Sequence, residues 1–255
     1  MGSIIQNLSS ITVELNKYIS VDCVVFGYDS EKLNVLLVNR TLSNPIDGSI
    51  QLSDYTLTGN HVFENERIED AANRVLFDLT GLKGIYLEQF KTFADPDRIS
   101  KPIDRQWLTS IERDPAQRVV SIGYFALLST RDVLLEWKGR EVKWVPLHKV
   151  GELGFDHNLI LNDALTALRN KMMHEPIGFE LLPIKFSLTQ LQTVYEKILD
   201  TQFDKRNFRK KVSRMKYVVP LNEKQTGVSH KPAQLYMFSR DVYEKTKTEQ
   251  FDFIV

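Results

Sequence analysis

The side chains best placed to do chemistry lie between residues 57 and 82, where the sequence reads LTGNHVFENERIEDAANRVLFDLTGL. The charged groups there are Glu66, Glu69, Asp70, Arg74 and Asp78. Carboxylates gathered on one loop and helix suit Mg²⁺, because that ion demands near-octahedral oxygen ligation and usually needs more than one carboxylate. A metal held in this way activates water. Metal-assisted hydrolysis is therefore the first chemistry to consider.

An amphipathic helix is the element that must position these groups. Apolar residues recur at helical spacing and give one apolar stripe: Ile68, Ala71, Ala72, Val75 and Leu79. An ordinary helix with no catalytic role would show the same stripe. The polar residues around it must therefore decide what the segment does.

Those polar residues resemble the Nudix box, G-x5-E-x7-R-E-U-x-E-E-x-G-U, where U is a bulky apolar residue. Glu66 stands at the first glutamate, Arg74 at the arginine, and Thr80-Gly81-Leu82 at the closing turn. In that family, the box grips a metal–diphosphate substrate in a loop–helix–loop.

The same comparison shows what has been lost. Asn60 replaces the glycine, Val75 replaces the glutamate after the arginine, and Asp78-Leu79 replaces the paired glutamates. Of the positions that hold Mg²⁺ in the family, only Asp78 retains a carboxylate. We therefore expect no catalytic residue, no metal site and no cofactor. The alternative is an active hydrolase that uses displaced carboxylates, for example Glu66, Glu69 or Asp70.

Composition places the chain among ordinary globular proteins. It has 255 residues, 26% charged residues and a formal net charge of zero, which suggests one or two domains. We find no apolar run long enough to cross a membrane and no signal peptide. Cys23, the single cysteine, is expected to be a small core residue in a strand. A cytoplasmic location fits these features.

Strand-like runs surround the box and predict a mixed α/β sandwich. They are rich in apolar and β-branched residues and cover residues 20–28, 33–40, 85–93, 119–128 and 141–147. Tyr28-Asp29-Ser30-Glu31 is a plausible turn between the first two. The fold class expected is α+β, with a Nudix-like α/β/α sandwich first.

A second resemblance lies beyond the box. Residues 92–98 (TFADPDR), Arg113-Asp114-Pro115 and residues 118–121 (RVVS) are similar to T-F-G-D-P-D-R-D-P-R-G-R-V-V-S of the Nudix-related transcriptional regulators. Residues 99–112 interrupt that motif as an insertion. Phe155-Asp156-His157 also resembles this group, although we expect His157 to be a core histidine satisfied by a nearby carbonyl. The resemblance covers almost the whole chain.

A long helix should join two domains. From Asp156 to about Met172, Leu161, Ala164 and Leu168 form a buried stripe with Leu165. His174-Glu175-Pro176-Ile177-Gly178 then breaks the helix. The expected division is a Nudix-like sensing domain at 1–155, a linker helix at 156–175 and a DNA-binding domain at 176–255.

The last domain reads as a winged helix-turn-helix. Ser187 is a good N-cap for a helix with Leu188, Leu191, Tyr195 and Ile198 on one face. A second helix, Asp204–Lys216, has Phe208, Val212 and Met215 as its apolar stripe. Two short strands, 217–220 and 234–238, form the wing around a basic loop.

Cations concentrate on the second helix and the wing, with Glu223 the only acid between Lys205 and Lys231. Such a face suits phosphates and guanine edges in a major groove, and a helix-turn-helix inserts its second helix there. The predicted DNA-binding residues are Lys205, Arg206, Asn207, Arg209, Lys210, Ser213, Arg214, Lys224 and Lys231. Ser229 and His230 would also contact the DNA backbone. The plainer alternative is a solvated basic face.

The resemblance implies that the first domain binds an effector. One branch of the family senses ADP-ribose and controls NAD synthesis, and another senses a sugar such as L-arabinose. Arginine suits a diphosphate, whereas a sugar prefers acids, amides and histidine. The predicted effector-binding residues are Arg40, Asn60, His61, Asp95, Asp97, Arg98 and Arg118. Arg113 is a further available cation.

The Asn60-His61 pair stands where phosphate-binding members have a G-G-F-type turn, which favours a sugar or sugar derivative over ADP-ribose. The expected partners are double-stranded operator DNA, a small-molecule effector and a second copy of the chain. A homodimer would match a roughly palindromic operator. No membrane partner is expected.

Overall fold

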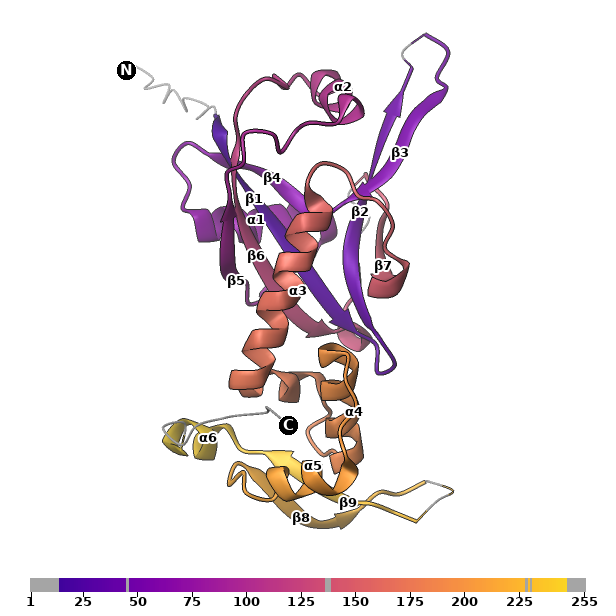
Figure 1. The fold of residues 1–255 in the computed structure, drawn as a ribbon, viewed down its shortest axis with the longest axis vertical. Helices are drawn as coiled ribbons and strands as arrows, with labels where there is room; N and C mark the ends of the chain where they lie inside the picture. Colours follow the sequence, from indigo (N-terminus) through magenta and orange to yellow (C-terminus); the bar gives the residue numbers. More distant parts are fainter. Residues whose placement is uncertain (1–13, 45, 136–138, 228, 230, 247–255) are drawn as a thin grey trace, which may run out of the picture.

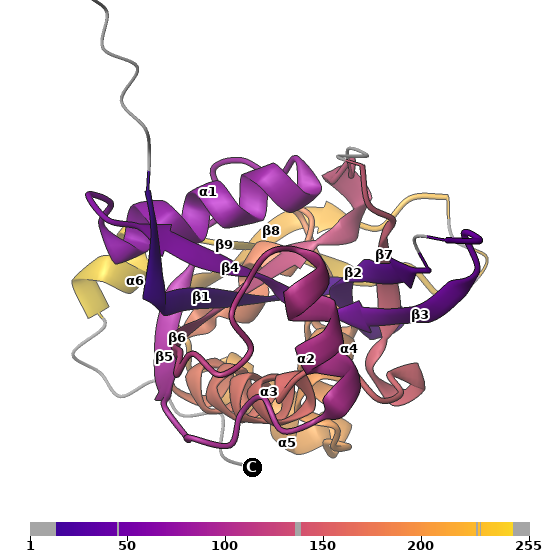
Figure 2. The ribbon, with the colours of Figure 1, turned by 90° about the horizontal axis from the view of Figure 1, so that it is seen from above.

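The computed structural model describes residues 14–44, 46–135, 139–227, 229 and 231–246. A seven-stranded sheet forms the upper part of the molecule in Figure 1, with strand order β3-β2-β1-β6-β5; β4 adds to β1 and β7 adds to β2. Only β1 and β6 are parallel, and the other pairs are antiparallel. The helices α1 and α3 cover opposite faces of the sheet (Figure 2).

The central strand β1 (Leu15–Tyr28) pairs with three neighbours. These are β2 (Leu33–Ser43), β4 (Thr58–Phe63) and β6 (Val120–Ser129). Outside them lie β3 (Ile50–Thr56), β5 (Glu88–Phe93) and β7 (Val142–Pro146). Short 3₁₀ turns, η1 (Thr130–Asp132) and η2 (Leu147–Lys149), follow β6 and β7.

Alternation along β1 explains why both faces of the sheet are buried, since successive side chains of a strand point to opposite sides. Val21 and Cys23 pack against α1 (Ile68–Thr80), whereas Val24 and Phe26 join the core that α3 covers. Cys23 is fully buried, as predicted, and its thiol donates to the Ala72 carbonyl at 3.7 Å. Burial raises the pKa of that thiol.

Some boundaries differ from the prediction. The strand expected from Ile85 begins only at Glu88, because Ile85 and Leu87 pack into the core beneath α1 instead of pairing with a strand. Asn60 and His61, expected in a turn, lie in β4, where they pair with Val21 and Ser20 of β1. The predicted α/β/α sandwich is otherwise confirmed.

The insertion at 99–112 folds as a helix, α2 (Pro102–Ser110), which begins with a proline in its first turn. Proline suits that position because its missing N–H has no helical partner there. In Figures 1 and 2, α2 lies over one end of the sheet, near the start of α3. It buries only two side chains, Asp104 and Leu108.

The helix α3 (His157–His174) lies within the range 156–175 expected for the linker helix. It leads into η3 (Pro176–Leu181) and then the lower part of the molecule in Figure 1. There, α4 (Leu188–Leu199) and α5 (Lys205–Val212) precede the hairpin β8 (Val218–Lys224) and β9 (Gln234–Phe238). A short helix, α6 (Arg240–Thr246), follows. This is the winged helix that the sequence predicted.

The predicted helix Asp204–Lys216 is shorter in the structure and ends at Val212. Tight turns replace its last part, with the Met215 N–H bonded to the Val212 carbonyl at 2.9 Å. These turns let Met215 pack against the core and bury Tyr217. Ser213 and Arg214 therefore lie just beyond the helix rather than within it.

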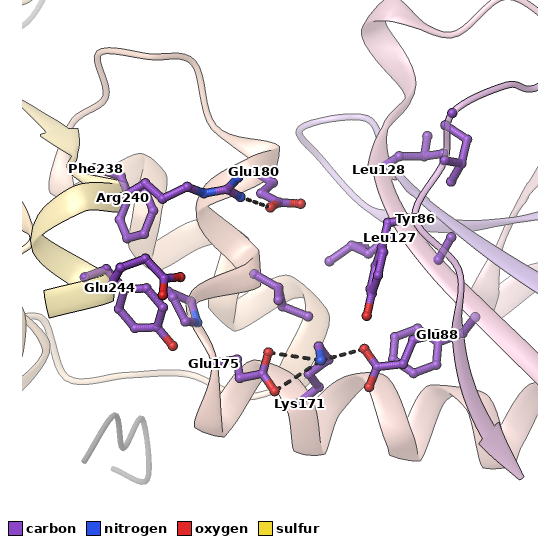
Figure 3. Close-up of a pocket in the computed structure, with 17 residues that line it drawn as sticks. Tyr86, Glu88, Leu127, Leu128, Lys171, Glu175, Glu180, Phe238, Arg240 and Glu244 are labelled. Carbon is purple, nitrogen blue, oxygen red and sulfur yellow. Dashed lines mark hydrogen bonds and ion pairs between the residues drawn. The ribbon is translucent and has the colours of Figure 1, made fainter. Parts of the chain in front are cut away.

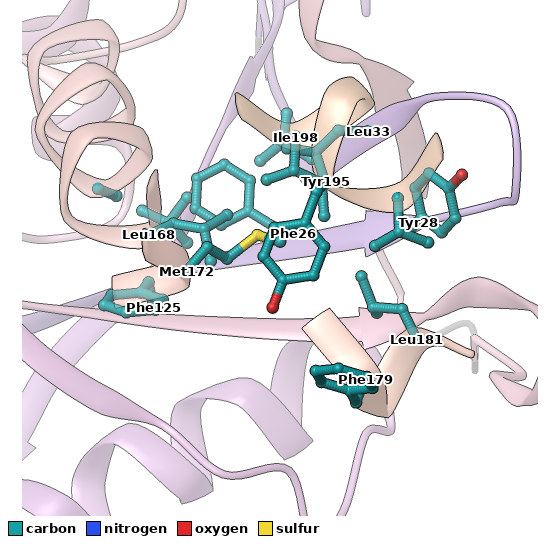
Figure 4. Close-up of a cluster of buried hydrophobic side chains, with 14 of the residues drawn as sticks. Phe26, Tyr28, Leu33, Phe125, Leu168, Met172, Phe179, Leu181, Tyr195 and Ile198 are labelled. Atoms are coloured by element: carbon teal, nitrogen blue, oxygen red, sulfur yellow. The ribbon is translucent and has the colours of Figure 1, made fainter. Parts of the chain in front are cut away.

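One apolar core runs through both parts of the molecule (Figure 4). Phe26 of β1, Met172 of α3, Phe179 of η3 and Tyr195 of α4 all belong to it. The winged helix thus shares its core with the sheet rather than hanging from a free linker. In the described part of the chain, no helix is long and apolar enough to cross a membrane.

Candidate functional site

The residues that survive from the Nudix box bind one another. The Arg74 guanidinium donates to both carboxylate oxygens of Glu66, at 2.6 and 2.8 Å, and to the His61 carbonyl at 3.0 Å. It also stacks 3.9 Å from the centre of the Phe63 ring. The Arg74 hydrogen bonds lower the pKa of Glu66. Asp78, 3.6 Å from Arg74, is largely exposed.

The positions that lack their glutamates now serve packing. Val75 is buried, and Leu79 packs against the same apolar cluster beneath α1. Glu69 and Asp70 point to the surface, where both residues are exposed. Among the described residues, no group of three or more histidine, cysteine, aspartate or glutamate side chains could hold a metal ion.

Two buried ion-pair clusters meet where α3 begins. In the first, the Arg98 guanidinium donates to Asp156 at 2.7 and 3.0 Å and lies 3.5 Å from Asp22. Asp22 also accepts the Ser121 hydroxyl at 2.5 Å and lies 3.4 Å from Nε2 of His157. We call these five residues the Arg98 cluster.

The hydrogen bonds of His157 define its tautomer. Its Nδ1 accepts the Leu57 N–H at 2.9 Å, so the ring proton sits on Nε2 and faces Asp22. The expected carbonyl partner was wrong, because the carboxylate of Asp22 faces the ring N–H instead. Burial opposes ionisation of Asp22, but His157, Arg98 and the Ser121 hydroxyl outweigh it and lower the pKa of Asp22 to about 2. Asp22 is therefore a buried anion at neutral pH.

The second cluster centres on Arg40, which is 2% exposed. Its guanidinium donates to Asp54 of β3 through Nε and Nη2, both at 2.7 Å, and to Asp104 of α2 at 2.5 Å. Trp107 and Phe155 flank it, with ring centres 5.3 and 4.6 Å from its Cζ. We call Arg40, Asp54, Asp104, Trp107 and Phe155 the Arg40 cluster. It touches the Arg98 cluster through the rings of Phe155 and His157, 5.3 Å apart.

The other predicted effector residues lie in simpler settings. The Asn60 amide oxygen accepts from Arg113 at 2.8 Å, and His61 Nδ1 lies 2.7 Å from the Asn16 carbonyl. Asp95 caps an exposed turn by accepting the Asp97 N–H at 2.8 Å. Arg118 is exposed and donates to the Ala94 carbonyl at 3.1 Å. The structure brings Arg40 and Arg98 into adjoining clusters.

A hollow of about 660 Å³ lies elsewhere, between the β5–β6 edge, the end of α3 and the winged helix (Figure 3). Lys171 bridges Glu88 and Glu175 across it, and Arg240 pairs with Glu180. None of the predicted effector residues lines this hollow. It therefore marks the junction of the domains rather than the predicted pocket.

The DNA-facing helix α5 is held by its buried side. Phe208 and Val212 are buried in the shared core, and Asp204 caps the helix by accepting the Asn207 N–H at 2.9 Å. Ser187 caps α4 with a complete capping box through Gln190. The sequence predicted the Ser187 cap, and the structure confirms it.

The rest of α5 and the two residues that follow it present the predicted DNA-binding residues to solvent. The following residues are exposed: Lys205, Arg206, Asn207, Arg209, Lys210, Ser213 and Arg214. Arg206, Arg209, Lys210 and Arg214 form no ion pair with any other described residue. In the wing, Lys224, Ser229 and Lys231 are exposed, whereas His230 lies outside the described residues. Glu223, the acid in this run, is paired with Lys185 at 2.7 Å.

Sequence reasoning missed the acids that complete the two clusters. Asp22, Asp54, Asp104 and Asp156 were not predicted as site residues, and neither was Trp107. Asp22 gave one signal, because it is the only charged residue within the apolar run of β1 from Val21 to Tyr28. No feature of the sequence pointed to Asp104, since nothing in the insertion shows which strand this side chain contacts.

The architecture defines the class of protein. A Nudix-like domain with buried ion-pair clusters precedes a winged helix with an exposed cationic helix, which is the organisation of a Nudix-related transcriptional regulator. A family model for the NrtR DNA-binding winged helix domain matches residues 178–238. The chain is similar to NrtR proteins along most of its length, which agrees with the predicted resemblance to Nudix-related transcriptional regulators and confirms the predicted fold class.

Individual relatives span most of the chain. The ADPR responsive transcriptional repressor NtrR of Acinetobacter baylyi is 29% identical over 230 residues, covering 88% of this chain and 83% of that protein. The crystal structure of Shewanella oneidensis NrtR complexed with a 27mer DNA is 26% identical, with a TM-score of 0.65. The same protein in a second crystal structure is 27% identical, with a TM-score of 0.64. Each of these alignments covers 91% of this chain and 97% of the other.

Proposed function

We propose that this protein is a transcriptional repressor that binds operator DNA through α5 and the wing and responds to ADP-ribose or a close relative of it. The observation that carries the proposal is the exposed cationic α5 on a chain that is similar, over 91% of its length, to a DNA-bound NrtR. The repressor role follows that of the Acinetobacter baylyi relative.

The effector is the point on which the comparisons favour the alternative over the main expectation. The sequence favoured a sugar such as L-arabinose, because Asn60 and His61 replace a phosphate-binding turn. The relative named above responds to ADP-ribose instead. Arg40, Arg98 and Arg113 are arginines of the sensing domain, and arginine suits a diphosphate.

Calorimetric titration of the full chain with ADP-ribose and with L-arabinose tests the effector directly. We expect heat of binding from ADP-ribose and none from L-arabinose. ADP-ribose should also release a retarded operator fragment, because an effector regulates only if it binds the free and DNA-bound states differently. Binding of L-arabinose alone would reverse the assignment.

The DNA interface has its own test. The double variant Arg206→Glu/Arg209→Glu should lose salt-sensitive binding to DNA from the region upstream of its own gene, since phosphate contacts give protein–DNA affinity its salt dependence. The matched control, Arg67→Glu/Lys83→Glu, reverses two charges on the sensing domain and should bind as the wild type does. An equal loss of DNA binding in both double variants would show a general charge effect. No DNA binding by the wild type at low salt would refute the DNA assignment.

We further propose that the protein does not hydrolyse its effector. Burial of Val75 and the Glu66–Arg74 pair support this, because they leave Asp78 as the remaining carboxylate at the metal positions of the box. Incubation with ADP-ribose and Mg²⁺ or Mn²⁺ should yield no AMP. Product at ordinary enzyme turnover would restore the hydrolase alternative.

A homodimer remains the expected assembly, because two recognition helices match a roughly palindromic operator. Light scattering coupled to gel filtration should give twice the chain mass of 29.5 kDa. A monomer both free and on DNA would contradict this expectation.

A further inference from the structure

We propose that Arg40 and the Phe155 N–H form an anion-binding site that the protein's own Asp104 occupies, and that a phosphate group of the effector displaces Asp104 from it. The inference rests on the proposed function, because it requires an anionic effector. It assigns the insertion helix α2 the role of a built-in competitor.

The contacts of Asp104 are those of a bound anion. One carboxylate oxygen lies 2.5 Å from Arg40 Nη2, and the other accepts the Phe155 N–H at 3.0 Å. A guanidinium beside a backbone N–H is also a donor pair suited to phosphate, whose oxygens accept charge-assisted hydrogen bonds in the same way. The Asp104 side chain is fully buried between these donors.

Asp104 is a surplus partner for the arginine. Asp54 already binds Arg40 through two hydrogen bonds of 2.7 Å, so a second carboxylate leaves the cluster with excess negative charge. Burying a charge without its own counter-charge is unfavourable. Among the described residues, the buried Nη1 of Arg40 has no hydrogen-bond partner. The arginine therefore keeps one donor that a ligand with more oxygens than a carboxylate could use.

The backbone around the site is shaped for this contact. Phe155 has a φ of 57°, in the left-handed region, although it is not glycine. Such conformations cost on the order of 1 kcal/mol and gather at ligand clamps and switch regions. Gly154 lies directly under the arginine, and a Cβ there would come within 2.8 Å of Arg40 Cζ and Nη2.

The helix that carries Asp104 is weakly attached. Leu108 is the only apolar side chain that α2 buries, and its outer residues are exposed. Segments with little buried apolar surface open at low free-energy cost. The insertion also interrupts the motif that the chain otherwise shares with related regulators.

Displacement of α2 would change the contacts that hold the start of the linker helix α3. The segment that carries Asp104 forms three hydrogen bonds to the residues just before α3. Arg98 donates to Asp156, and Lys101 donates to the Leu153 carbonyl at 3.0 Å. Asp104 accepts the Phe155 N–H. The far end of α3 continues into the winged helix. Loss of the Asp104 contact therefore loosens the start of the element that joins the sensor to the DNA reader.

The test compares the full-length wild type, Asp104→Asn and a matched control, Asp114→Asn, which changes an exposed aspartate just after the insertion. Calorimetry measures binding of ADP-ribose and of inorganic pyrophosphate. We expect Asp104→Asn to bind ADP-ribose about tenfold more tightly, a change of about 1.4 kcal/mol, and Asp114→Asn to match the wild type. Hydrogen exchange on the wild type should show residues 101–110 exchanging faster once ADP-ribose is bound, which requires no variant to fold.

The outcomes separate this inference from the proposed effector. If ADP-ribose binds the wild type and Asp104→Asn equally and α2 becomes more protected, the effector stands and displacement is refuted. If ADP-ribose binds neither but pyrophosphate binds Asp104→Asn about tenfold more tightly, the anion site stands and the effector is wrong. Binding of neither compound to either protein refutes both.

Discussion

Asp22 shows how a single buried charge can make stability depend on pH. Its folded pKa is about 2, below the ordinary value of 3.8, so the folded state favours the anion. The stabilisation is complete above pH 4 or so and is lost as the pH falls through about 2. Asp22→Asn keeps the shape and an acceptor for His157 but removes the charge. We expect it to lower the unfolding free energy by about 2 kcal/mol at pH 7.

Urea unfolding of the wild type and Asp22→Asn between pH 7 and pH 2 measures that difference. The gap between the two proteins should hold from pH 7 to pH 5 and close towards pH 2. Asp95→Asn, which changes an exposed turn aspartate, is the control and should track the wild type. A gap that stays constant at every pH would show that the loss comes from packing and not from the charge.

Gly154 gives a second prediction at the residue scale. Gly154→Ala would place a methyl group within 2.8 Å of Arg40 and 2.9 Å of Thr56. Because Arg40 is fixed by two carboxylates, it cannot swing away freely, and overpacking of this kind costs about 1–3 kcal/mol. Thermal unfolding should show the loss, whereas Gly151→Ala, which meets no atom within 4 Å, should not. An unchanged midpoint in Gly154→Ala would mean that the Arg40 cluster is loosely packed.

The arginines of the two clusters could be predicted from the sequence, but their acidic partners could not. Arg40 and Arg98 could be chosen because arginine chemistry suits an anion. Their partners could not, since Arg40 and Asp104 are 64 residues apart and Arg98 and Asp156 are 58 apart. Such pairs depend on how the strands and the insertion are brought together, which no local pattern records.

At the scale of elements, the strongly patterned segments were predictable. The apolar runs of β1, β2 and β6 and the stripes of α1, α3 and α4 all placed elements correctly, apart from small shifts at their ends. By contrast, β3 reads IQLSDYT, and Thr56 is its one buried residue, so its apolar alternation is short and weak. This segment forms a strand because its backbone pairs with the edge of β2. The amphipathic signal of α2 was equally weak, because its buried side includes a charged residue.

The cap of α4 provides a prediction for an element. Ser187 accepts the Gln190 N–H, while the Gln190 side chain returns to the Ser187 N–H at 2.8 Å. Ser187→Ala removes the first bond and should cost about 1 kcal/mol. Because α4 supports α5, weaker DNA binding at 37 °C should accompany a lower melting temperature. Ser110→Ala, at the exposed end of α2, controls for loss of a hydroxyl; an unchanged melting temperature in Ser187→Ala would refute the role of the cap.

For the whole molecule, α3 connects the two candidate sites. The Arg98 and Arg40 clusters lie at its start, and the winged helix follows its end. The shared apolar core extends from β1 through α3 to α4 and α5, so the two domains are packed together and not merely tethered. The coupling that we propose between effector and DNA therefore has a continuous packed path.

Met172 lies in the middle of this path, where a single substitution tests whether the molecule unfolds as one unit. It is fully buried, and its Cε would lie 2.9 Å from a Cβ at Gly178. Met172→Ala leaves a cavity and should cost about 2–5 kcal/mol. We expect hydrogen exchange in increasing denaturant to show β1 and α4 losing protection together, earlier than in the wild type. Met173→Ala, the neighbouring and less buried methionine, should change little. Loss of protection in α4 well before β1 would instead show two independent folding units.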